Sequence, residues 1–178
     1  MLKNLFKRKS IEQSAAEPWL IVQAPLSGKV IPLSEVDDPV FAQGMVGDGI
    51  AILPESDEVL APVSGSLTHM FPTGHAAGIT TAEGLEILIH VGLDTVELKG
   101  DGFAILVEQG QQVTIGTPLI KLDLMKLRET ARSLVTPVII TNMDRVKELS
   151  KTTMQHVEAD GDWAFKVRLT DGQEASRP

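Results

Sequence analysis

The strongest constraint on the fold of this 178-residue chain comes from two short internal repeats, each a turn followed by a short apolar run. Residues 24–28 (APLSG) recur as residues 61–65 (APVSG), and residues 47–53 (GDGIAIL) recur as residues 100–106 (GDGFAIL). Pro lacks a backbone donor and Gly accepts positive φ, so such segments suit the entry to a strand and a tight turn. Because these repeats are unequally spaced in the chain, we expect repeated turn-and-strand units within one sandwich and not a solenoid.

Short Val/Ile/Leu runs between 15 Gly and 10 Pro residues predict an all-β fold, an antiparallel β-sandwich or closed barrel with one or two short helices. Apolar residues at intervals of three and four predict a helix or helical turn over residues 124–134. A second helix is predicted at residues 143–149, where Asn142 or Thr141 is a suitable N-cap. Residues 163–169 (WAFKVRL) alternate and are expected to close the sheet.

The length predicts one domain, which we place at residues 19–170, between an N-terminal segment of residues 1–18 and a flexible tail of residues 171–178. Residues 1–9 (MLKNLFKRK) set three apolar side chains at helical spacing among four cations. Two interpretations of this segment stay open. It is either a short helix that makes weak contact with the inner face of a membrane or a basic tail without structure.

Composition excludes several classes of function. The chain has no cysteine, which excludes disulfides, thiolate metal sites and a cysteine nucleophile. No run approaches the roughly 20 apolar residues that span a bilayer, so we expect a soluble, cytoplasmic protein. The net charge is −8, and removing the four cations of residues 1–9 leaves −12 for residues 10–178. This net negative charge disfavours nucleic acid as a partner and favours a basic protein.

Residues 86–91 (EILIHV) have the two-residue period of a β-strand and carry His90 among apolar neighbours. Such a histidine is either a core residue with satisfied ring nitrogens or a functional group. The preceding loop holds His75, and a hairpin joining this loop to the strand would lay His75 against His90. Thr73, two residues before His75, is close enough to offer its hydroxyl to a ring nitrogen.

Two histidines and a threonine allow three kinds of chemistry. With Asp94 as a third ligand the imidazoles could bind a divalent metal, although no HxH or HExxH spacing is present. They could act as general acid and base, but the motif lacks the Ser, Cys or carboxylate pair of acyl or glycosyl transfer. Alternatively, one imidazole carries a phosphoryl group while the other hydrogen-bonds its oxygens. No GxxxxGK[ST] loop occurs, so the phosphoryl donor would be another molecule and not ATP bound here.

The chain resembles the glucose-type enzyme IIA of the bacterial phosphoenolpyruvate-dependent sugar phosphotransferase system over about residues 20–168. The resemblance rests on segments in the same order: APLSGKVIPL, VFAQGMVGDGIAILP, LAPVSGSL, FPTGHAAGI, ILIHVGLDTVELKGDGF, GQQVTIGTPL and LVTPVIITN. It implies an antiparallel β-sandwich of jelly-roll or barrel-sandwich type. It also implies a free-standing IIA component, since no IIB or IIC segment is fused to it.

This resemblance implies a phosphotransferase component in which His90 accepts the phosphoryl group, His75 stabilises its oxygens and Thr73 orients His75. The implied donor is the histidine-containing phosphocarrier protein, and the implied acceptor is a cysteine of a sugar-permease IIB domain. No cofactor is required by this scheme. A zinc ion held by His75 and His90 together with a partner's carboxylate is expected only at a partner interface.

The resemblance further implies a docking face around the histidines. Asp38 and Asp94 would meet basic residues of partners. The remaining members match an apolar surface: Val40, Phe41, Met45, Val46, Phe71 and Val96. The same face serves a second hypothesis, a regulatory binding module for transporters or kinases, because a phosphate there would repel partners selected for the unmodified form.

Residues 110–129 carry another resemblance, to the hairpin of biotin carrier domains, with Lys126 at the biotinylated position. One of the two methionines that flank such a lysine is a leucine here, and a biotin carrier has no use for His75 and His90. We therefore expect the shared part to be a turn-and-strand geometry only.

Overall fold

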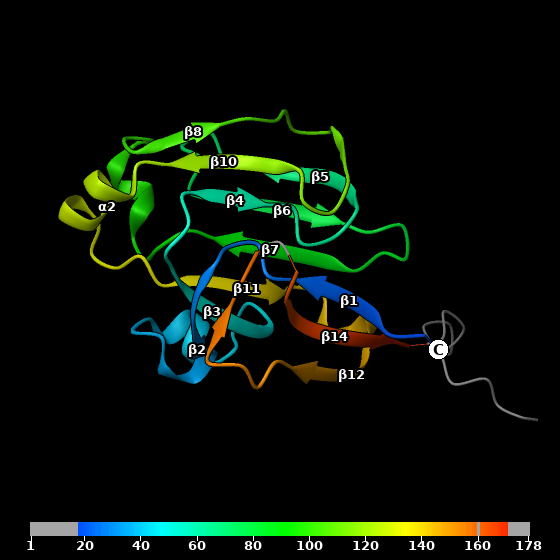
Figure 1. The fold of residues 1–178 in the computed structure, drawn as a ribbon. Coiled ribbons are helices and arrows are strands. Elements are labelled where there is room, and N and C mark those ends of the chain that lie inside the picture. The colour runs from blue at the N-terminus through cyan, green and yellow to red at the C-terminus, as the bar shows by residue number, and fades with distance from the viewer. Residues whose placement is uncertain (1–17, 160, 171–178) are drawn as a thin grey trace, which may run out of the picture.

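The computed structural model describes residues 18–159 and 161–170 (Figure 1). The predictions for residues 1–17 and for residues 171–178 lie outside the described residues. Among the residues it describes, no helix has the length and apolar character needed to cross a membrane.

The described chain forms short elements joined by tight turns. In order they are β1 (Leu20–Gln23), β2 (Gly28–Pro32), η1 (Leu33–Glu35), α1 (Pro39–Ala42), β3 (Asp48–Pro54), β4 (Glu58–Leu60), β5 (Gly65–Met70), β6 (Ala76–Thr80), β7 (Glu86–His90), η2 (Thr95–Leu98), β8 (Phe103–Ile105), β9 (Gln112–Val113), β10 (Pro118–Leu122), α2 (Leu124–Thr130), β11 (Thr136–Ile140), η3 (Met143–Arg145), β12 (Val146–Lys151), β13 (His156–Val157) and β14 (Trp163–Leu169).

The strands make one large sheet and two small ones. The large sheet has the order β13-β2-β3-β11-β7-β6-β5-β9, and the small sheets have the orders β1-β14-β12 and β4-β10-β8. Every pairing between these strands is antiparallel. In Figure 1 the β4-β10-β8 sheet lies at the top, next to β5 and β6 of the large sheet, and the β1-β14-β12 sheet lies at the lower right. The prediction of an antiparallel β-sandwich is confirmed.

One apolar core unites the three sheets. Its fully buried members include Ile87 of the large sheet, Val59 and Ile120 of one small sheet and Phe165 of the other. A second, smaller cluster lies on the opposite side of the large sheet, where η1 and α1 cover β3 and β11; its buried members are Leu33, Val36, Phe41, Ala51, Leu93 and Ile139. Burying each such side chain contributes on the order of 1.5–3 kcal/mol, so this small cluster fixes α1 firmly on the sheet.

Of the two helices predicted from the sequence, one forms over part of its predicted range and the other does not form. Helix α2 lies within residues 124–134 but ends at Thr130, and the next residue is extended. The prediction of a helix over residues 143–149 is wrong, because only the 3-10 turn η3 forms before the chain continues as β12. Asn142 makes no capping bond; its side chain accepts the N–H of Glu86 at 2.9 Å. Pairing of β12 with β14 supplies backbone hydrogen bonds that outweigh the local helical tendency.

Both internal repeats lead into strands. Residues 24–28 and 61–65 run into β2 and β5, residues 47–53 cover all but the last residue of β3, and residues 100–106 contain β8. Residues 163–169 form β14 as predicted, but this strand is the centre of its own small sheet and does not extend the large one.

The pairing of β3 with β11 depends on a glycine. Gly49 lies opposite Ile139, and a Cβ added to Gly49 would lie 2.1 Å from the carbonyl oxygen of Val138. We expect Gly49→Ala to lower the free energy of unfolding by about 3 kcal/mol, because the backbones would have to separate. Chemical denaturation measures this, with Gly161→Ala as control, since nothing lies within 4 Å of its added Cβ. Equal midpoints for the two variants would contradict the expectation.

Candidate functional site

His90 ends β7 on the side of the large sheet that faces away from the main core. Ile87 and Ile89 are 1% exposed and point into that core, so the two-residue period of the strand turns His90 to the other side, where it is half-buried. His90 lies opposite Ala76 on β6. His75, the residue before Ala76, is therefore its neighbour at the end of the ladder. The strand predicted from the sequence therefore holds His90 at the edge of the core and not within it.

His75 is that neighbour and is only 6% exposed. Its carbonyl oxygen accepts the N–H of Val91 at 2.7 Å, a backbone bond that joins the loop before β6 to the end of β7. The loop turns at Gly74, whose φ is +70°, and a Cβ there would lie 3.0 Å from the Cβ of Phe103. Glycine is required at such a turn both for its positive φ and for its lack of a side chain.

Four rings from three segments form a row. The centroids of Phe41 and His90, of His90 and His75, and of His75 and Phe71 are each 5.2 Å apart. Phe41 comes from α1, whose first turn is fixed by Asp38; its carboxylate accepts the N–H of Val40 at 2.8 Å. An aromatic ring therefore packs against the far side of each imidazole.

Each imidazole also has one polar partner. Nδ1 of His90 lies 2.8 Å from the carbonyl oxygen of Gly92. Nδ1 of His75 lies 2.5 Å from the hydroxyl of Thr73. Burial lowers the pKa of His75, and the nearby charge of His90 lowers it further, so His75 is neutral near pH 7. The structure thus brings Thr73, His75 and His90 together as the sequence predicts.

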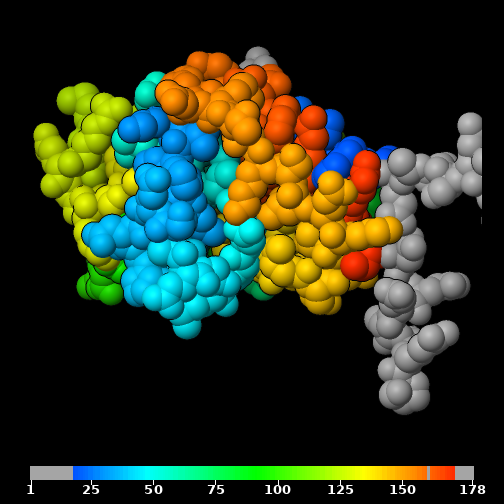
Figure 2. Space-filling view, turned by 90° about the horizontal axis from the view of Figure 1, so that it is seen from below, coloured from blue at the N-terminus to red at the C-terminus, as the bar shows by residue number. Residues whose placement is uncertain are grey.

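Two of the predicted apolar docking residues, Phe41 and Phe71, belong to this row, and the others lie close to row members in the chain. Five of the predicted residues are partly exposed: Val40, Met45, Val46, Phe71 and Val96, with Met45 the most exposed at 69%. Phe41 differs, since it is 6% exposed and packs under His90. Seen from below in Figure 2, the residues around α1 lie between the α2 region and the β12 region.

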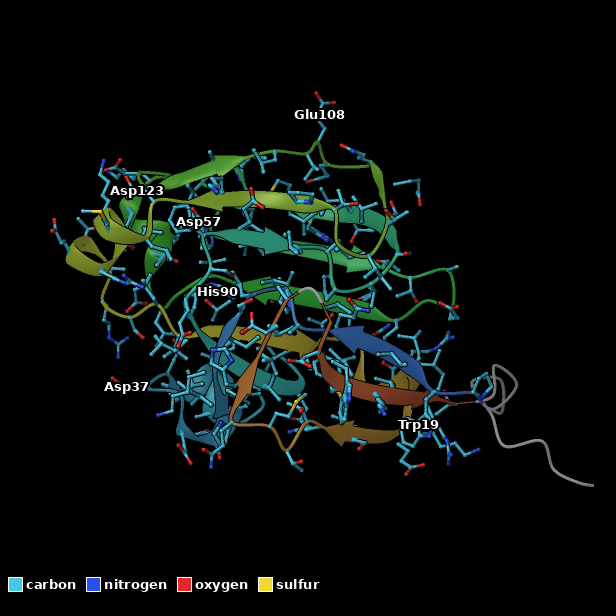
Figure 3. All side chains as sticks on the ribbon, viewed as in Figure 1. Trp19, Asp37, Asp57, His90, Glu108 and Asp123 are labelled. Atoms are coloured by element: carbon cyan, nitrogen blue, oxygen red, sulfur yellow. The ribbon has the colours of Figure 1, made fainter. Side chains whose placement is uncertain are left out.

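Sequence reasoning missed a charged bridge that includes Asp94, one of the predicted docking residues. Arg132 donates through Nη1 to Asp94 Oδ2 at 2.8 Å and through Nη2 to Asp37 Oδ2 at 3.0 Å. Asp37 and His90 lie toward one end of the molecule, opposite the end that carries Trp19 (Figure 3). No local sequence pattern links residues so far apart in the chain, so only the fold reveals the bridge.

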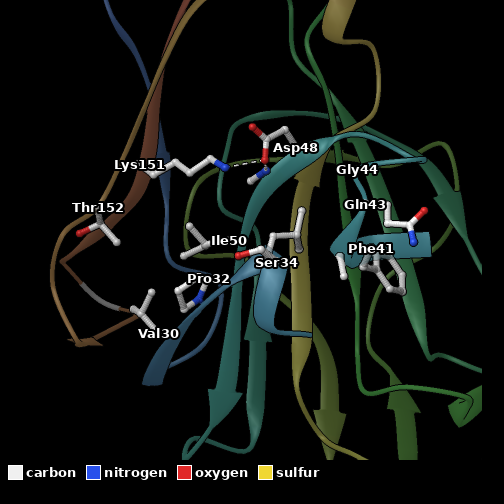
Figure 4. Close-up of a pocket in the computed structure, with 13 residues that line it drawn as sticks. Val30, Pro32, Ser34, Phe41, Gln43, Gly44, Asp48, Ile50, Lys151 and Thr152 are labelled. Atoms are coloured by element: carbon white, nitrogen blue, oxygen red, sulfur yellow. Dashed lines mark hydrogen bonds and ion pairs between the residues drawn. The ribbon is translucent and has the colours of Figure 1, made fainter. Parts of the chain in front are cut away.

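Phe41 also borders a hollow of about 410 Å³ between α1 and β3. Val30, Pro32 and Ile50 line its floor. In Figure 4 Phe41 lies at the right of this hollow, and the ion pair between Lys151 and Asp48 lies at its top. Neither His75 nor His90 lines the hollow, so it is not part of the histidine site.

Two alternative chemistries find no support in the described part of the chain. No group of three or more His, Cys, Asp or Glu side chains there could hold a metal ion, and Asp94, the suggested third ligand, pairs with Arg132. Lys126, the lysine of the biotin-carrier comparison, lies within α2 instead of a hairpin turn, and its amine pairs with Asp101.

The chain matches known proteins over most of its length. The family model described as phosphoenolpyruvate-dependent sugar phosphotransferase system, EIIA 1, matches residues 20–146. A glucose-specific EIIA component of Oceanobacillus iheyensis is 44% identical over 94% of this chain and 99% of its own length. One of Staphylococcus epidermidis is 42% identical over 88% of this chain and 92% of its own length. The solved glucose permease IIA of Mycoplasma capricolum has a TM-score of 0.78 at 45% identity, covering 84% of this chain and 96% of that one.

The ring row, its polar partners and these similarities agree with the resemblance seen in the sequence. The chain belongs to the EIIA 1 family of the phosphoenolpyruvate-dependent sugar phosphotransferase system.

Proposed function

We propose that this chain is a phosphocarrier in which Nε2 of His90 accepts a phosphoryl group and passes it on. The observation that carries the proposal is the 2.8 Å contact between Nδ1 of His90 and the carbonyl oxygen of Gly92. A carbonyl only accepts hydrogen bonds, so Nδ1 holds the ring proton and Nε2 keeps its lone pair. Near neutral pH such an imidazole is a ready nucleophile.

In the proposed step, Nε2 of His90 forms a bond to phosphorus as the donor's bond to phosphorus breaks, and that electron pair returns to the donor. The His90 ring gains positive charge as the new bond forms. The Gly92 carbonyl stabilises that charge through the Nδ1–H, and no proton has to leave the ring. Charge stabilised by a fixed dipole requires no reorganisation during the reaction.

His75 is proposed to stabilise the phosphoryl oxygens. When the Thr73 hydroxyl donates to Nδ1 of His75, the ring proton lies on Nε2, which can then donate to an oxygen of the transferred group. The neighbouring ring centroids lie 5.2 Å apart, so a phosphoryl group on one imidazole is within reach of the other. Phe41 and Phe71 flank the pair and limit access of water, which would otherwise hydrolyse the phosphohistidine.

The proposed donor is the histidine-containing phosphocarrier protein, and the proposed acceptor is a cysteine of a permease IIB domain. The exposed apolar residues around the ring row and the acidic charge of the chain support docking of basic protein partners. The names of the relatives support a permease of the glucose type. We propose that the protein acts in the cytoplasm, where it would meet both partners.

No resident cofactor is part of this proposal. His75 and His90 offer two imidazole ligands, whereas a zinc ion takes four, so a partner's carboxylate would have to complete a site at an interface. Regulatory binding of transporters or kinases is proposed only as a consequence of the same exposed face. Pull-down with and without phosphoryl donor tests it, and equal capture in both states would contradict it.

The first prediction concerns the acceptor atom. With phosphoenolpyruvate and the general phosphotransfer proteins, the wild-type chain should gain an acid-labile, base-stable phosphate, and His90→Gln should gain none. His75→Gln keeps the acceptor but lacks a donor to the phosphoryl oxygens, so transfer should slow by about 10²–10³-fold.

His69→Gln is the control, since His69 is an exposed histidine on β5 outside the ring row. It should behave as the wild type. Phosphate uptake by His90→Gln together with its loss in His75→Gln would reverse the assigned roles, and uptake by both variants would refute the proposal.

The second prediction concerns Thr73. Thr73→Val removes the hydroxyl that selects the His75 tautomer, so transfer should slow about tenfold, the equivalent of one hydrogen bond of roughly 1.4 kcal/mol. Thr73→Ser should restore the rate. Nitrogen NMR of the ring should show the proton of His75 shifting away from Nε2 in the valine variant only. An unchanged ring spectrum in that variant would contradict the positioning role.

The third prediction concerns pH. Because the pKa of His75 lies below the ordinary 6.5 in the folded chain, the unfolded chain binds the proton first as pH falls. Stability from this group is therefore full above about pH 6.5 and is lost as pH falls toward the folded pKa. Denaturation midpoints between about pH 7.5 and 5 should fall less steeply for His75→Gln than for wild type. The control His69→Gln keeps His75 and should retain the wild-type loss; equal slopes for His75→Gln and wild type would contradict the expectation.

A further inference from the structure

Arg132 forms a three-bond bridge between two segments, and their carboxylates, Asp37 and Asp94, make up an acidic rim. Nη1 donates to Oδ2 of Asp94 at 2.8 Å, while Nη2 donates to the carbonyl oxygen of Asp37 at 2.8 Å and to its Oδ2 at 3.0 Å. The segment of Asp94 continues into η2, and the segment of Asp37 continues into α1. One guanidinium therefore pairs with one carboxylate from each of the two segments.

The bridge lies at the surface. The side chains of Arg132, Asp94 and Asp37 are 48%, 57% and 93% exposed. Ion pairs this exposed hold their partners weakly, because water competes for each charge. A cation arriving on another protein can thus exchange with the guanidinium of Arg132 without opening the fold.

The position of Asp94 does not depend on Arg132. Leu93 is 1% exposed, and its N–H donates to the carbonyl oxygen of Ser133 at 2.9 Å. Asp94 itself is held at φ +56° as the residue before η2, and the Thr95 hydroxyl donates to the carbonyl oxygen of Val91. Backbone pairing and burial fix this loop, so the guanidinium supplies charge to the rim and is not its scaffold.

We propose that Arg132 is an internal stand-in for a partner's cation: it covers Asp94 and Asp37 while the docking face is free, and an arginine or lysine of the docking protein displaces it. The inference rests on the proposed function, because it assumes that basic partners dock beside His90. Arg132 is then a specificity-determining residue. It lowers affinity for every basic surface and favours partners that place a cation at this rim.

The test measures binding of the unphosphorylated chain to the histidine-containing phosphocarrier protein by calorimetry, at about 0.02 M and about 0.5 M salt. Arg132→Gln should bind about threefold more tightly than wild type at low salt, since two carboxylates are freed, and the gain should vanish at high salt. Arg132→Lys keeps the charge and should stay within about twofold of wild type.

Lys121→Gln is the matched control. Lys121 also lies between two carboxylates, with Nζ 3.0 Å from Asp57 and 3.5 Å from Glu58, but on the β4-β10-β8 sheet. Both glutamine variants change the net charge equally, so their difference reports the rim alone. In phosphotransfer assays Arg132→Gln should lower the KM for the donor and leave kcat unchanged.

Two outcomes overturn the inference. The first is that Arg132→Gln binds no more tightly than Lys121→Gln. The second is that Arg132→Gln binds less tightly than wild type and Arg132→Lys restores affinity, which would make the bridge a scaffold. Failure of the wild-type chain to take up phosphate would instead overturn the proposed function. Phosphate uptake and affinity are separate readouts, so the two failures are distinguishable.

Discussion

The backbone bond from the N–H of Val91 to the carbonyl oxygen of His75, at 2.7 Å, sets the geometry on which the site depends. It continues the antiparallel ladder in which His90 lies opposite Ala76. The bond sets His75 opposite Val91, one position along the ladder from the pair of His90 and Ala76, so backbone pairing makes the two histidines neighbours. Successive positions of a regular strand point to opposite faces, so the contact between the imidazoles also depends on the turn of the loop at Gly74. The aromatic rings on either side then hold the imidazoles in place.

That pairing gives the two histidines different environments. His75 is 6% exposed and has a depressed pKa, whereas His90 is half-buried at the end of its strand. Neighbouring groups with different environments can take different roles in one reaction. The buried, neutral imidazole suits a fixed hydrogen-bond donor, and the more accessible one suits exchange with a partner. Phe41 belongs to the small apolar cluster under α1 and packs on His90. This cluster therefore helps to keep the environment of His90 different from that of His75.

The sequence predicted the parts of this arrangement that depend on local pattern. Alternation located β7 and β14, and the short separation of Thr73 from His75 predicted their contact. The helix predicted over residues 143–149 failed because its competitor, pairing with β14, is distant in the chain. The bridge through Arg132 escaped prediction for the same reason, since 38 and 95 residues separate Arg132 from its two partners. Local composition carries no information about such separations.

A phosphocarrier has to release each partner after transfer, so its docking face should bind partners reversibly. Five apolar residues of the predicted docking face stay exposed, which favours association. The proposed role of Arg132 opposes association, because its guanidinium pairs with carboxylates that a basic partner would use. A phosphoryl group on His90 would add roughly two negative charges beside that rim. In the proposed function, the balance between apolar attraction and an occupied acidic rim would keep docking reversible, and the phosphorylation state of His90 would decide which partner the face retains.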